Sequence, residues 1–474
     1  MEKQAKNYYA GAWHASKQYI DIYSPCDHAL LGQVPAMQKD EIDRVMTAAR
    51  EGATTWASLS LHERATYLHR AADYLLEDED MIASLLSKEI AKGISACRDE
   101  VRRTVQLIHY TAEERLRLNG EYIDGGSFSE QDKTAHAIVS REPLGVVVAI
   151  APFNYPVNLT ASKIAPALMA GNSVVIKGPT QGSLSCLAMV HSLLKANFPA
   201  GVINTVTGRG RDIGDYLLTH QEVDFINFTG STEVGQAIEN KVGLTPTLME
   251  LGGKDAAIVL EDASLEACAT EIIKGAFSYS GQRCTAIKRV IVVEEVANSL
   301  VHLLKEKINQ LSVGYPCEDA TITPLISKTA ADFVIDLIQD AKNKGAMLLL
   351  DEKREENLLW PQLIDHVDST MQLYDTEPFG PVLPIIRVSS IEEAIQCCNA
   401  SQYGLQASIF TNNYPVALEI AKKLEVGTVH VNHRTQRGPD HFPFLGIKHS
   451  GMGVQGIRYA IEAMSRVQST VIYF

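Results

Sequence analysis

Between residues 145 and 247 the chain alternates short apolar runs with helical segments, and this alternation restricts the possible folds most. The runs GVVVAI, SVVIK, GVINTV and VDFINF have the character of buried strands, and segments such as NLTASKIAPALMAGN and LSCLAMVHSLLKAN separate them. Strands spaced by helices of this length predict βαβ units and a parallel sheet. Ligands of such sheets bind beyond the carboxyl ends of the strands, so the loops after these runs are candidate sites.

A second set of apolar runs, including DAAIVL and RVIVVEE, begins near residue 248. The sequence therefore predicts an α/β protein with two doubly wound parallel-sheet domains, plus an arm of β-strands. We expect a Rossmann-like cofactor domain over residues 1–247, with the strand arm inserted at about 120–143, and a catalytic domain over 248–445. Residues 446–474 should return to the cofactor domain and end in a strand, AMSRVQSTVIYF, that pairs with another element or subunit.

The composition of the chain argues against some classes of binding partner. The chain has 474 residues and a formal net charge of -14, which argues against nucleic acid and anionic membranes as partners. It contains no apolar run long enough to span a bilayer. Its eight cysteines show no metal-ligand spacing, and its polar start does not resemble a signal peptide. We therefore expect free thiols, no metal site and a cytoplasmic location.

One cysteine stands in a distinctive setting. Cys284 lies in SYSGQRCTA, after the helical segment LEACATEIIKGAF, and Gly281 can bend the chain so that the sulfur faces a cleft. The neighbouring Arg283 would favour the thiolate, the nucleophilic form. A single cysteine is more often a small buried apolar residue. The segment LMELGGKD changes this interpretation, because it presents Glu250 beside a double glycine, and a thiol with a carboxylate suffices for covalent catalysis followed by hydrolysis.

Two glycine patterns compete as dinucleotide sites. In GRGRDIGD the last glycine spacing is one residue too long, so a glycine-rich turn is the better interpretation. In FTGSTEVG a strand leads into Gly230 and Ser231 at a helix start, which suits a pyrophosphate, although an ordinary capped helix would look the same. Lys177 and Thr180, in KGPT, can hold an additional phosphate, and no carboxylate is present there to bond a ribose hydroxyl. This favours NADP over NAD, unless Lys177 is simply a solvated lysine at a strand end.

Together these segments resemble the aldehyde dehydrogenase superfamily over essentially the whole chain. The matching pieces, in order, are PFNYP, VVIKGP, FTGSTEVG, MELGGKD, GQRCTA, TEPFGP, YGLQASIFT and FPFLGIKHSG. Within the superfamily, REPLG, YSGQRCTA and especially NHRTQRGPDHFPFLG resemble the members that oxidise a triose phosphate with NADP and without phosphorylation. The resemblance implies oxidation of D-glyceraldehyde 3-phosphate by NADP and water to 3-phosphoglycerate and NADPH, in a homotetramer.

The resemblance also implies residue roles. Cys284 matches the nucleophile, Asn154 the oxyanion-hole side chain, and Glu250 the base that activates water. For the cofactor, the family pattern implies contacts to the nicotinamide half, the adenosine 2′-phosphate and the pyrophosphate from Ala151, Lys177, Thr180, Asp215, Gly230, Ser231, Glu377 and Phe379. Ala151 replaces a serine that is common in this group, and Gly178 replaces a proline.

For the substrate phosphate, the resemblance implies a pocket formed by Arg103, Tyr155, Arg283 and Arg437, with Thr285 beside it. Physical chemistry agrees, because arginines from distant segments can converge on one dianion with bidentate geometry.

Three alternatives remain open at this point. Another NADP-dependent enzyme, such as a succinate-semialdehyde dehydrogenase, would also use arginine, but for a carboxylate. A thiol hydrolase would use Cys284 and Glu250 without a nucleotide site. A non-catalytic scaffold would not need Cys284, Glu250 and Asn154 together.

Overall fold

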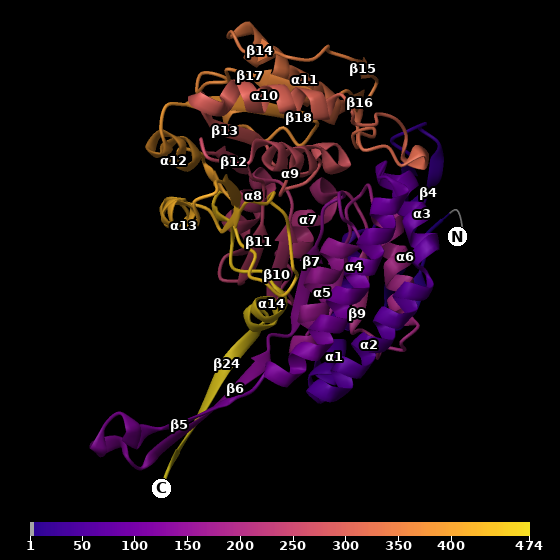
Figure 1. Ribbon diagram of the computed structural model, residues 1–474. Coiled ribbons are helices and arrows are strands. Elements are labelled where there is room, and N and C mark those ends of the chain that lie inside the picture. The colour runs from indigo at the N-terminus through magenta and orange to yellow at the C-terminus, as the bar shows by residue number, and fades with distance from the viewer. Residues whose placement is uncertain (1–3) are drawn as a thin grey trace.

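The computed structural model describes residues 4–474. Two mainly parallel sheets lie one above the other in Figure 1, and a third, antiparallel sheet projects from the lower one. Helices cover both faces of each parallel sheet, as the clusters of buried apolar side chains show. The predicted α/β class with parallel sheets is confirmed.

The first sheet has the order β23-β11-β10-β7-β8-β9, and all its strands except the short β23 are parallel. The bounds of its strands are β7 (Val146–Ile150), β8 (Ser173–Lys177), β9 (Ile203–Val206), β10 (Phe225–Thr229), β11 (Thr247–Glu250) and β23 (Gly451–Met452). β11 pairs with β10 on one side and with β23 on the other, so Thr247–Glu250 belongs to this sheet.

Side-chain alternation along these strands divides the first domain's core in two. Val147 and Ala149 face a cluster formed with α2 to α6 and α14, whereas Val146 and Val148 face α1, α7 and α8. The bounds of these helices are α1 (Lys39–Ala57), α2 (Leu61–Glu77), α3 (Glu79–Ile90), α4 (Ile94–Glu113), α5 (Asn158–Ala170), α6 (Ser183–Leu194), α7 (Gly210–Leu218), α8 (Thr232–Val242) and α14 (Ile457–Ala463). The GRGRDIGD segment is therefore a turn followed by a helix, since α7 begins at its second glycine.

The second sheet has the order β14-β17-β18-β13-β12-β20-β21. The bounds of its strands are β12 (Ala256–Val259), β13 (Arg289–Val293), β14 (Met347–Leu348), β17 (Gln362–Asp365), β18 (Val382–Val388), β20 (Gln406–Phe410) and β21 (Thr428–Val431). Two helices cover one face and three the other, namely α9 (Leu265–Phe277) and α10 (Glu294–Ile308) against α11 (Lys328–Asn343), α12 (Ile391–Asn399) and α13 (Tyr414–Lys423). The predicted helix LEACATEIIKGAF coincides with α9.

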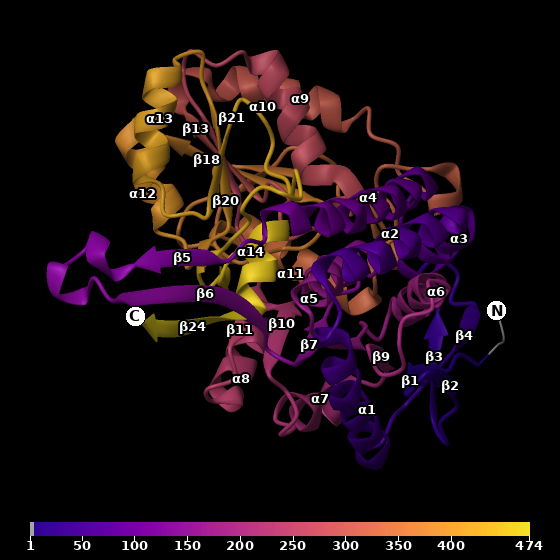
Figure 2. The ribbon, with the colours of Figure 1, turned by 90° about the horizontal axis from the view of Figure 1, so that it is seen from below.

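The predicted strand arm is present. It consists of β5 (Glu121–Asp124), β6 (Ala135–Pro143) and the terminal strand β24 (Ser465–Tyr473), which pairs with β6 along its whole length. The three strands run side by side away from the body, with the C-terminus near the tip of the arm (Figure 2). Large apolar side chains are exposed along it, including Tyr122, Ile138, Val467, Val471 and Tyr473. An exposed strand edge with such side chains is a surface that another chain can cover.

Short strand pairs complete the structure. Their bounds are β1 (Asn7–Tyr9) with β2 (Ala12–His14), β3 (Tyr19–Tyr23) with β4 (Leu30–Pro35), β15 (Arg354–Glu355) with β16 (Leu358–Leu359), and β19 (Tyr403–Gly404) with β22 (Ile447–Lys448). Within residues 4–474, no helix combines the length and the apolar character needed to cross a membrane.

Candidate active site

Cys284 lies in the loop that joins α9 to β13. A short 3-10 turn, Ser278–Gly281, ends the helix, because Tyr279 and Ser280 both adopt a positive φ. Gly281 also has a positive φ, and a Cβ there would lie 2.5 Å from the carbonyl oxygen of Gly380, so only glycine fits this bend. Burial raises the pKa of the Cys284 thiol to about 11, against the opposing effect of Lys288. At neutral pH the resting sulfur is therefore a thiol.

Arg283 does not have the role that the sequence suggested. Its guanidinium donates a hydrogen bond to the carbonyl oxygen of Gly275 in α9, and its Nε has no hydrogen-bond partner among the described residues. The cations that favour the thiolate of Cys284 are Lys288 and Arg437 instead. The expectation that Arg283 activates the nucleophile was wrong, because its side chain is buried against α9.

Asn154 follows β7 and is buried. Its Nδ2 donates to the backbone carbonyl oxygen of Gln282 at 2.9 Å. This bond ties the Asn154 side chain to the backbone two residues before Cys284. A side-chain amide nitrogen carries two hydrogens, so this bond leaves one for a second acceptor.

Glu250 is the last residue of β11, and both of its oxygens are engaged. Arg437 Nη1 donates to Oε1, while Lys163 Nζ at 3.1 Å and Thr229 Oγ1 at 2.5 Å donate to Oε2. Burial acts to raise the pKa of Glu250, but Arg437 and Lys163 outweigh it and lower the pKa to about 2. Glu250 is thus an ionised carboxylate that is a weak base in this arrangement.

Lys163 is a site residue that the sequence reasoning missed. It is fully buried in α5, and its Nζ contacts Asn227 at 3.1 Å, Thr229 at 2.6 Å and Glu250. Burial lowers its pKa, against the opposing effect of Glu250. A lysine inside the apolar helix NLTASKIAPALMA was the available signal, because a buried cation requires a partner.

Lys288 is a second missed residue, and it connects the nucleophile loop to the TEPFGP segment. Its Nζ donates to the carbonyl oxygen of Cys284 and lies 2.9 Å from Oε1 of Glu377. Phe379 packs edge-on against Phe153, with ring centroids 6.0 Å apart. Glu377 and Phe379, both predicted cofactor contacts, are thus brought to the same region as Cys284.

The predicted cofactor residues of the β8 loop lie at the carboxyl end of that strand. Lys177 is buried and donates from Nζ to the carbonyl oxygen of Gly178 at 3.1 Å. Burial lowers its pKa to about 8. Thr180 is half-buried in the same loop, and Ala151 is buried after β7 on the neighbouring strand.

Glu89, in α3, supports this loop and was also missed. Its carboxylate is fully buried and accepts hydrogen bonds from the backbone N–H groups of Gly182, Leu184 and Ser185 at 2.8–3.0 Å. It therefore fixes the start of α6, and with it the end of the segment that carries Lys177 and Thr180.

The remaining cofactor candidates lie around α7 and α8. Gly230 follows β10, and Ser231 is the N-cap of α8, with Oγ accepting from the N–H of Val234 at 3.4 Å. Asp215, on α7, is exposed and is bound by Lys241 of α8 through both oxygens at 2.7 Å. Gly230 and Ser231 thus occupy the predicted strand-to-helix turn, whereas Asp215 forms a surface ion pair.

The structure brings together some of the predicted substrate residues. Arg103 binds Asp440 through two hydrogen bonds of 2.6 and 3.0 Å, and it lies against Gly438, next to Arg437. Arg103 also interacts electrostatically with Tyr155. Arg103, Tyr155 and Arg437 therefore gather near one loop, whereas Arg283 is turned toward α9.

Tyr155 rests on a buried ion pair. Lys92 Nζ lies 3.4 Å from its ring centroid and 2.6 Å from Oε2 of Glu100. The other oxygen of Glu100 accepts from the N–H groups of Val157 and Asn158, at 3.0 and 3.1 Å. This ion pair holds the turn that carries Asn154 and Tyr155 against α4. Thr285 is buried, and its carbonyl oxygen accepts from Thr435 at 2.9 Å.

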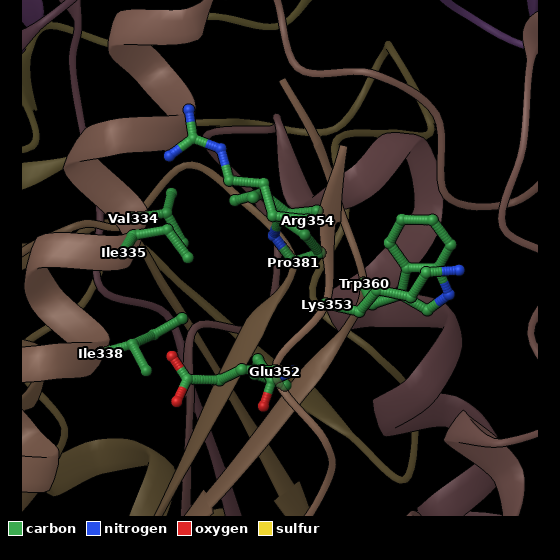
Figure 3. A pocket seen from close by; sticks show the side chains of 10 residues that line it. Val334, Ile335, Ile338, Glu352, Lys353, Arg354, Trp360 and Pro381 are labelled. Carbon is green, nitrogen blue, oxygen red and sulfur yellow. The ribbon is translucent and has the colours of Figure 1, made fainter. Parts of the chain in front are cut away.

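A separate cavity of about 230 Å³ lies between α11 and the β15–β16 hairpin (Figure 3). Its lining includes apolar and charged side chains, and Lys353 Nζ lies 3.8 Å from the ring centroid of Trp360. Its labelled lining residues are Val334, Ile335, Ile338, Glu352, Lys353, Arg354, Trp360 and Pro381. Within the described part of the chain, no predicted site residue lines it, so it is distinct from the cluster around Cys284.

The chain was compared with known proteins. The model of the aldehyde dehydrogenase family matches residues 13–470. The chain is 55% identical over 471 residues to an NADP-dependent glyceraldehyde-3-phosphate dehydrogenase of Streptococcus equinus, with 99% of each chain covered. It is 34% identical to a 3-sulfolactaldehyde dehydrogenase of Priestia aryabhattai, covering 99% of this chain and 98% of the relative.

A solved structure is similar to this chain in both fold and sequence. The NADP-dependent glyceraldehyde-3-phosphate dehydrogenase from Bacillus halodurans C-125, complexed with NADP, matches with a TM-score of 0.98 and 50% identity over 99% of each chain. Full-length matches of sequence and fold leave one conclusion: the chain belongs to the aldehyde dehydrogenase family.

Proposed function

We propose that this protein oxidises D-glyceraldehyde 3-phosphate with NADP and water, giving 3-phosphoglycerate and NADPH without consuming inorganic phosphate. The observation that carries the proposal is the grouping of Cys284 with Glu250 and Arg437, in a chain 55% identical to a relative named for this aldehyde and cofactor. A thiol and a carboxylate suit covalent oxidation followed by hydrolysis, and arginine suits a phosphate.

The covalent half of the reaction takes place on Cys284. Its sulfur, as the thiolate, attacks the aldehyde carbon and forms a C–S bond, and the carbonyl oxygen becomes an oxyanion. The free hydrogen of Asn154 Nδ2 and the backbone N–H of Cys284 stabilise that charge in the thiohemiacetal. Because burial raises the pKa of the thiol to about 11, the nearby cations Lys288 and Arg437 are needed to favour the thiolate.

The residues present fit NADP. Lys177 is a buried cation at the carboxyl end of β8, with Thr180 in the same loop, and this arrangement suits a 2′-phosphate. Ser231 and Gly230 begin α8, where backbone N–H groups suit a pyrophosphate. Glu377 and Phe379 lie near Cys284 and would position the nicotinamide. When bound, NADP supplies the two-electron acceptor that leaves a thioester on Cys284.

Hydrolysis requires Glu250. The carboxylate takes a proton from a water molecule, the water oxygen bonds to the thioester carbon, and the C–S bond breaks. The carboxylic acid leaves and Cys284 regains its thiol. Water resolves the thioester, so no acyl phosphate forms.

Arg103, Tyr155 and Arg437 would bind the phosphate of the substrate, with Thr285 lying beside Cys284. A relative that is 34% identical is named for 3-sulfolactaldehyde, an aldehyde that also carries an anionic group. A succinate-semialdehyde dehydrogenase is the nearest alternative, with a carboxylate in place of the phosphate.

The deciding experiment follows NADPH absorbance after mixing the enzyme with D-glyceraldehyde 3-phosphate and NADP, with inorganic phosphate left out. Rapid reduction that added phosphate does not enhance would support the proposal. Turnover of succinate semialdehyde or 3-sulfolactaldehyde, with none of the triose phosphate, would keep the chemistry and reject the substrate.

We also propose a homotetramer in the cytoplasm, with the division into cofactor domain, catalytic domain and returning C-terminal segment that the sequence predicts. The exposed apolar side chains of the β5–β6–β24 arm support assembly with further copies. All eight cysteines are free within the described residues 4–474, as expected in a reducing compartment. The acidic charge supports a small-molecule substrate rather than nucleic acid or an anionic membrane.

Preference for NADP should depend on pH through Lys177. Its pKa of about 8 means that the ammonium is charged below that pH and is lost as pH rises through it. NADP affinity should therefore fall by up to about tenfold between about pH 7 and pH 9, whereas NAD affinity should not, because NAD has no 2′-phosphate. Fluorescence titration would measure both. Lys177→Arg, which stays charged, should remove the pH dependence, and parallel curves for the two cofactors would contradict this role.

Replacing Asn154 by alanine should lower kcat by about 10²–10³-fold with little change in KM, because it removes one oxyanion donor. Steady-state kinetics would measure kcat and KM separately, and alkylation of Cys284 by iodoacetamide would show that the thiol is still reactive. A rise in KM at unchanged kcat would mean that Asn154 only shapes the pocket.

A further inference from the structure

Arg437 has two competing anionic partners. Its Nη1 is bonded to Oε1 of Glu250, and this oxygen has no other hydrogen-bond partner in the part of the chain that the structure describes. The proposed function also assigns Arg437 to the substrate phosphate. The guanidinium of Arg437 can therefore bind either Glu250, the base that activates the hydrolytic water, or the phosphate of the substrate.

Of the two cations on Glu250, only Arg437 is placed to turn toward a substrate. Lys163 is fully buried and already bonded to Asn227 and Thr229 as well as to Glu250. The Arg437 side chain is partly exposed and lies over the ring of Phe444, 4.8 Å from its centroid. It is therefore at the edge of the cluster, whereas Lys163 is locked within it.

Arg437 also lies next to the other candidate anion ligand. A Cβ on Gly438 would lie 3.0 Å from Nη2 of Arg103, so the guanidinium of Arg103 packs against the residue that follows Arg437. A dianion held by Arg103 would attract Arg437 with a charge twice that of the Glu250 carboxylate.

The strength of Glu250 as a base depends on whether Arg437 binds this carboxylate or the substrate phosphate. Burial raises its pKa, and Arg437 is the largest of the opposing influences that bring it down to about 2. Loss of the Arg437 contact would leave burial opposed mainly by Lys163 and Thr229. The pKa of Glu250 would rise, and the carboxylate would become a better proton acceptor.

We propose that the substrate dianion draws Arg437 away from Glu250 and so frees this carboxylate to activate the hydrolytic water. In the step that is gated, Glu250 takes a proton from water, the water oxygen bonds to the thioester carbon, the C–S bond breaks, and the proton passes to the Cys284 sulfur. An aldehyde without the dianion leaves Arg437 on Glu250, and the thioester formed from it is hydrolysed slowly. This inference rests on the proposed function, since it takes the phosphate of glyceraldehyde 3-phosphate as the anion.

The test supplies the substrate in two pieces, D-glyceraldehyde and the phosphite dianion, to the wild-type enzyme with NADP. D-Glyceraldehyde alone should give a rapid burst of NADPH followed by a slow steady state, because acylation outpaces hydrolysis. Phosphite should raise the steady-state rate at least about tenfold, a fraction of what a positioned base contributes, and leave the burst amplitude unchanged. Phosphite should also inhibit oxidation of glyceraldehyde 3-phosphate competitively.

The variant Arg437→Met provides a second test, which does not depend on phosphite binding. In a single-turnover experiment the thioester formed from D-glyceraldehyde on this variant should decay at least as fast as the wild-type thioester, because Glu250 is already released, and phosphite should not change that decay. Its KM for glyceraldehyde 3-phosphate should rise. Arg434→Met is the matched control, since Arg434 lies on the same loop but pairs with Glu271 at 2.7 Å, and it should keep the phosphite response.

Two results would overturn the inference while leaving the proposed function intact. In one, phosphite inhibits oxidation of glyceraldehyde 3-phosphate but does not accelerate D-glyceraldehyde. In the other, Arg437→Met hydrolyses the D-glyceraldehyde thioester more slowly than the wild type. If the wild type failed to oxidise glyceraldehyde 3-phosphate, the proposed function would fall, and the inference with it.

Discussion

Replacement of Cys284 by serine is expected to abolish NADPH formation from D-glyceraldehyde 3-phosphate while NADP binding is retained. A serine hydroxyl is a far weaker nucleophile than a thiolate. Removal of a covalent nucleophile should therefore lower kcat by at least about 10⁴-fold. Steady-state absorbance would measure the loss, and fluorescence titration would measure NADP binding.

Cys268→Ser is a suitable control for this variant. Cys268 is buried within α9, on the helix that leads to the nucleophile loop, and it belongs to the apolar core of the second sheet. Its replacement should affect thermal stability rather than catalysis. Substantial turnover by Cys284→Ser would exclude a covalent mechanism through this residue.

Replacement of Glu250 by glutamine should separate the two halves of the reaction. Acylation does not use the carboxylate, so one NADPH per Cys284 should still form in a rapid burst. Hydrolysis should then slow by about 10²–10⁴-fold, the range that a positioned base contributes. Stopped-flow absorbance would give the burst and the steady-state rate in one experiment.

The thioester that accumulates in Glu250→Gln offers an independent check. Intact mass spectrometry should detect a covalent adduct on the protein, and hydroxylamine should release it. A variant with no burst would place Glu250 in the first half of the reaction instead. The amide retains the shape of the side chain and an acceptor for Thr229, which limits damage to the fold.

Much of the fold followed from local patterns. β7, β8 and β10 were predicted by their apolar runs, and α9 by its helical periodicity, because burial of a strand or a helix face imposes its period on the sequence. The arm was predicted from glycine-interrupted strands near residues 120–143 and from the alternation at the C-terminus. β11 was not predicted as a strand, because it is four residues long and pairs with β10 through contacts that no local pattern reports.

The candidate site, like the fold, was predicted in part from local patterns. Cys284 and Glu250 could be named because each lies in a short motif with a residue type suited to its chemistry, whereas Asn154 was named only through the family resemblance. Lys163 and Lys288 were missed, although a lysine in an apolar segment was a visible signal for each. Arg283 was misjudged because adjacency to Cys284 in the chain does not fix the direction of its side chain, which packs against α9.

The sequence by itself determined the α/β class and the family, and it predicted Cys284 as the nucleophile, because these depend on periodicity and on residue types within short segments. Only the tertiary structure decided which cation faces which carboxylate: Arg437 binds Glu250, Arg103 binds Asp440, and Lys288 faces Glu377. Except for Lys288 and Glu377, which are fewer than 100 residues apart, these partners are separated by 187 or more positions. Such pairings arise from the packing of distant segments, and packing also supplies the burial that sets the pKa values of Cys284 and Glu250.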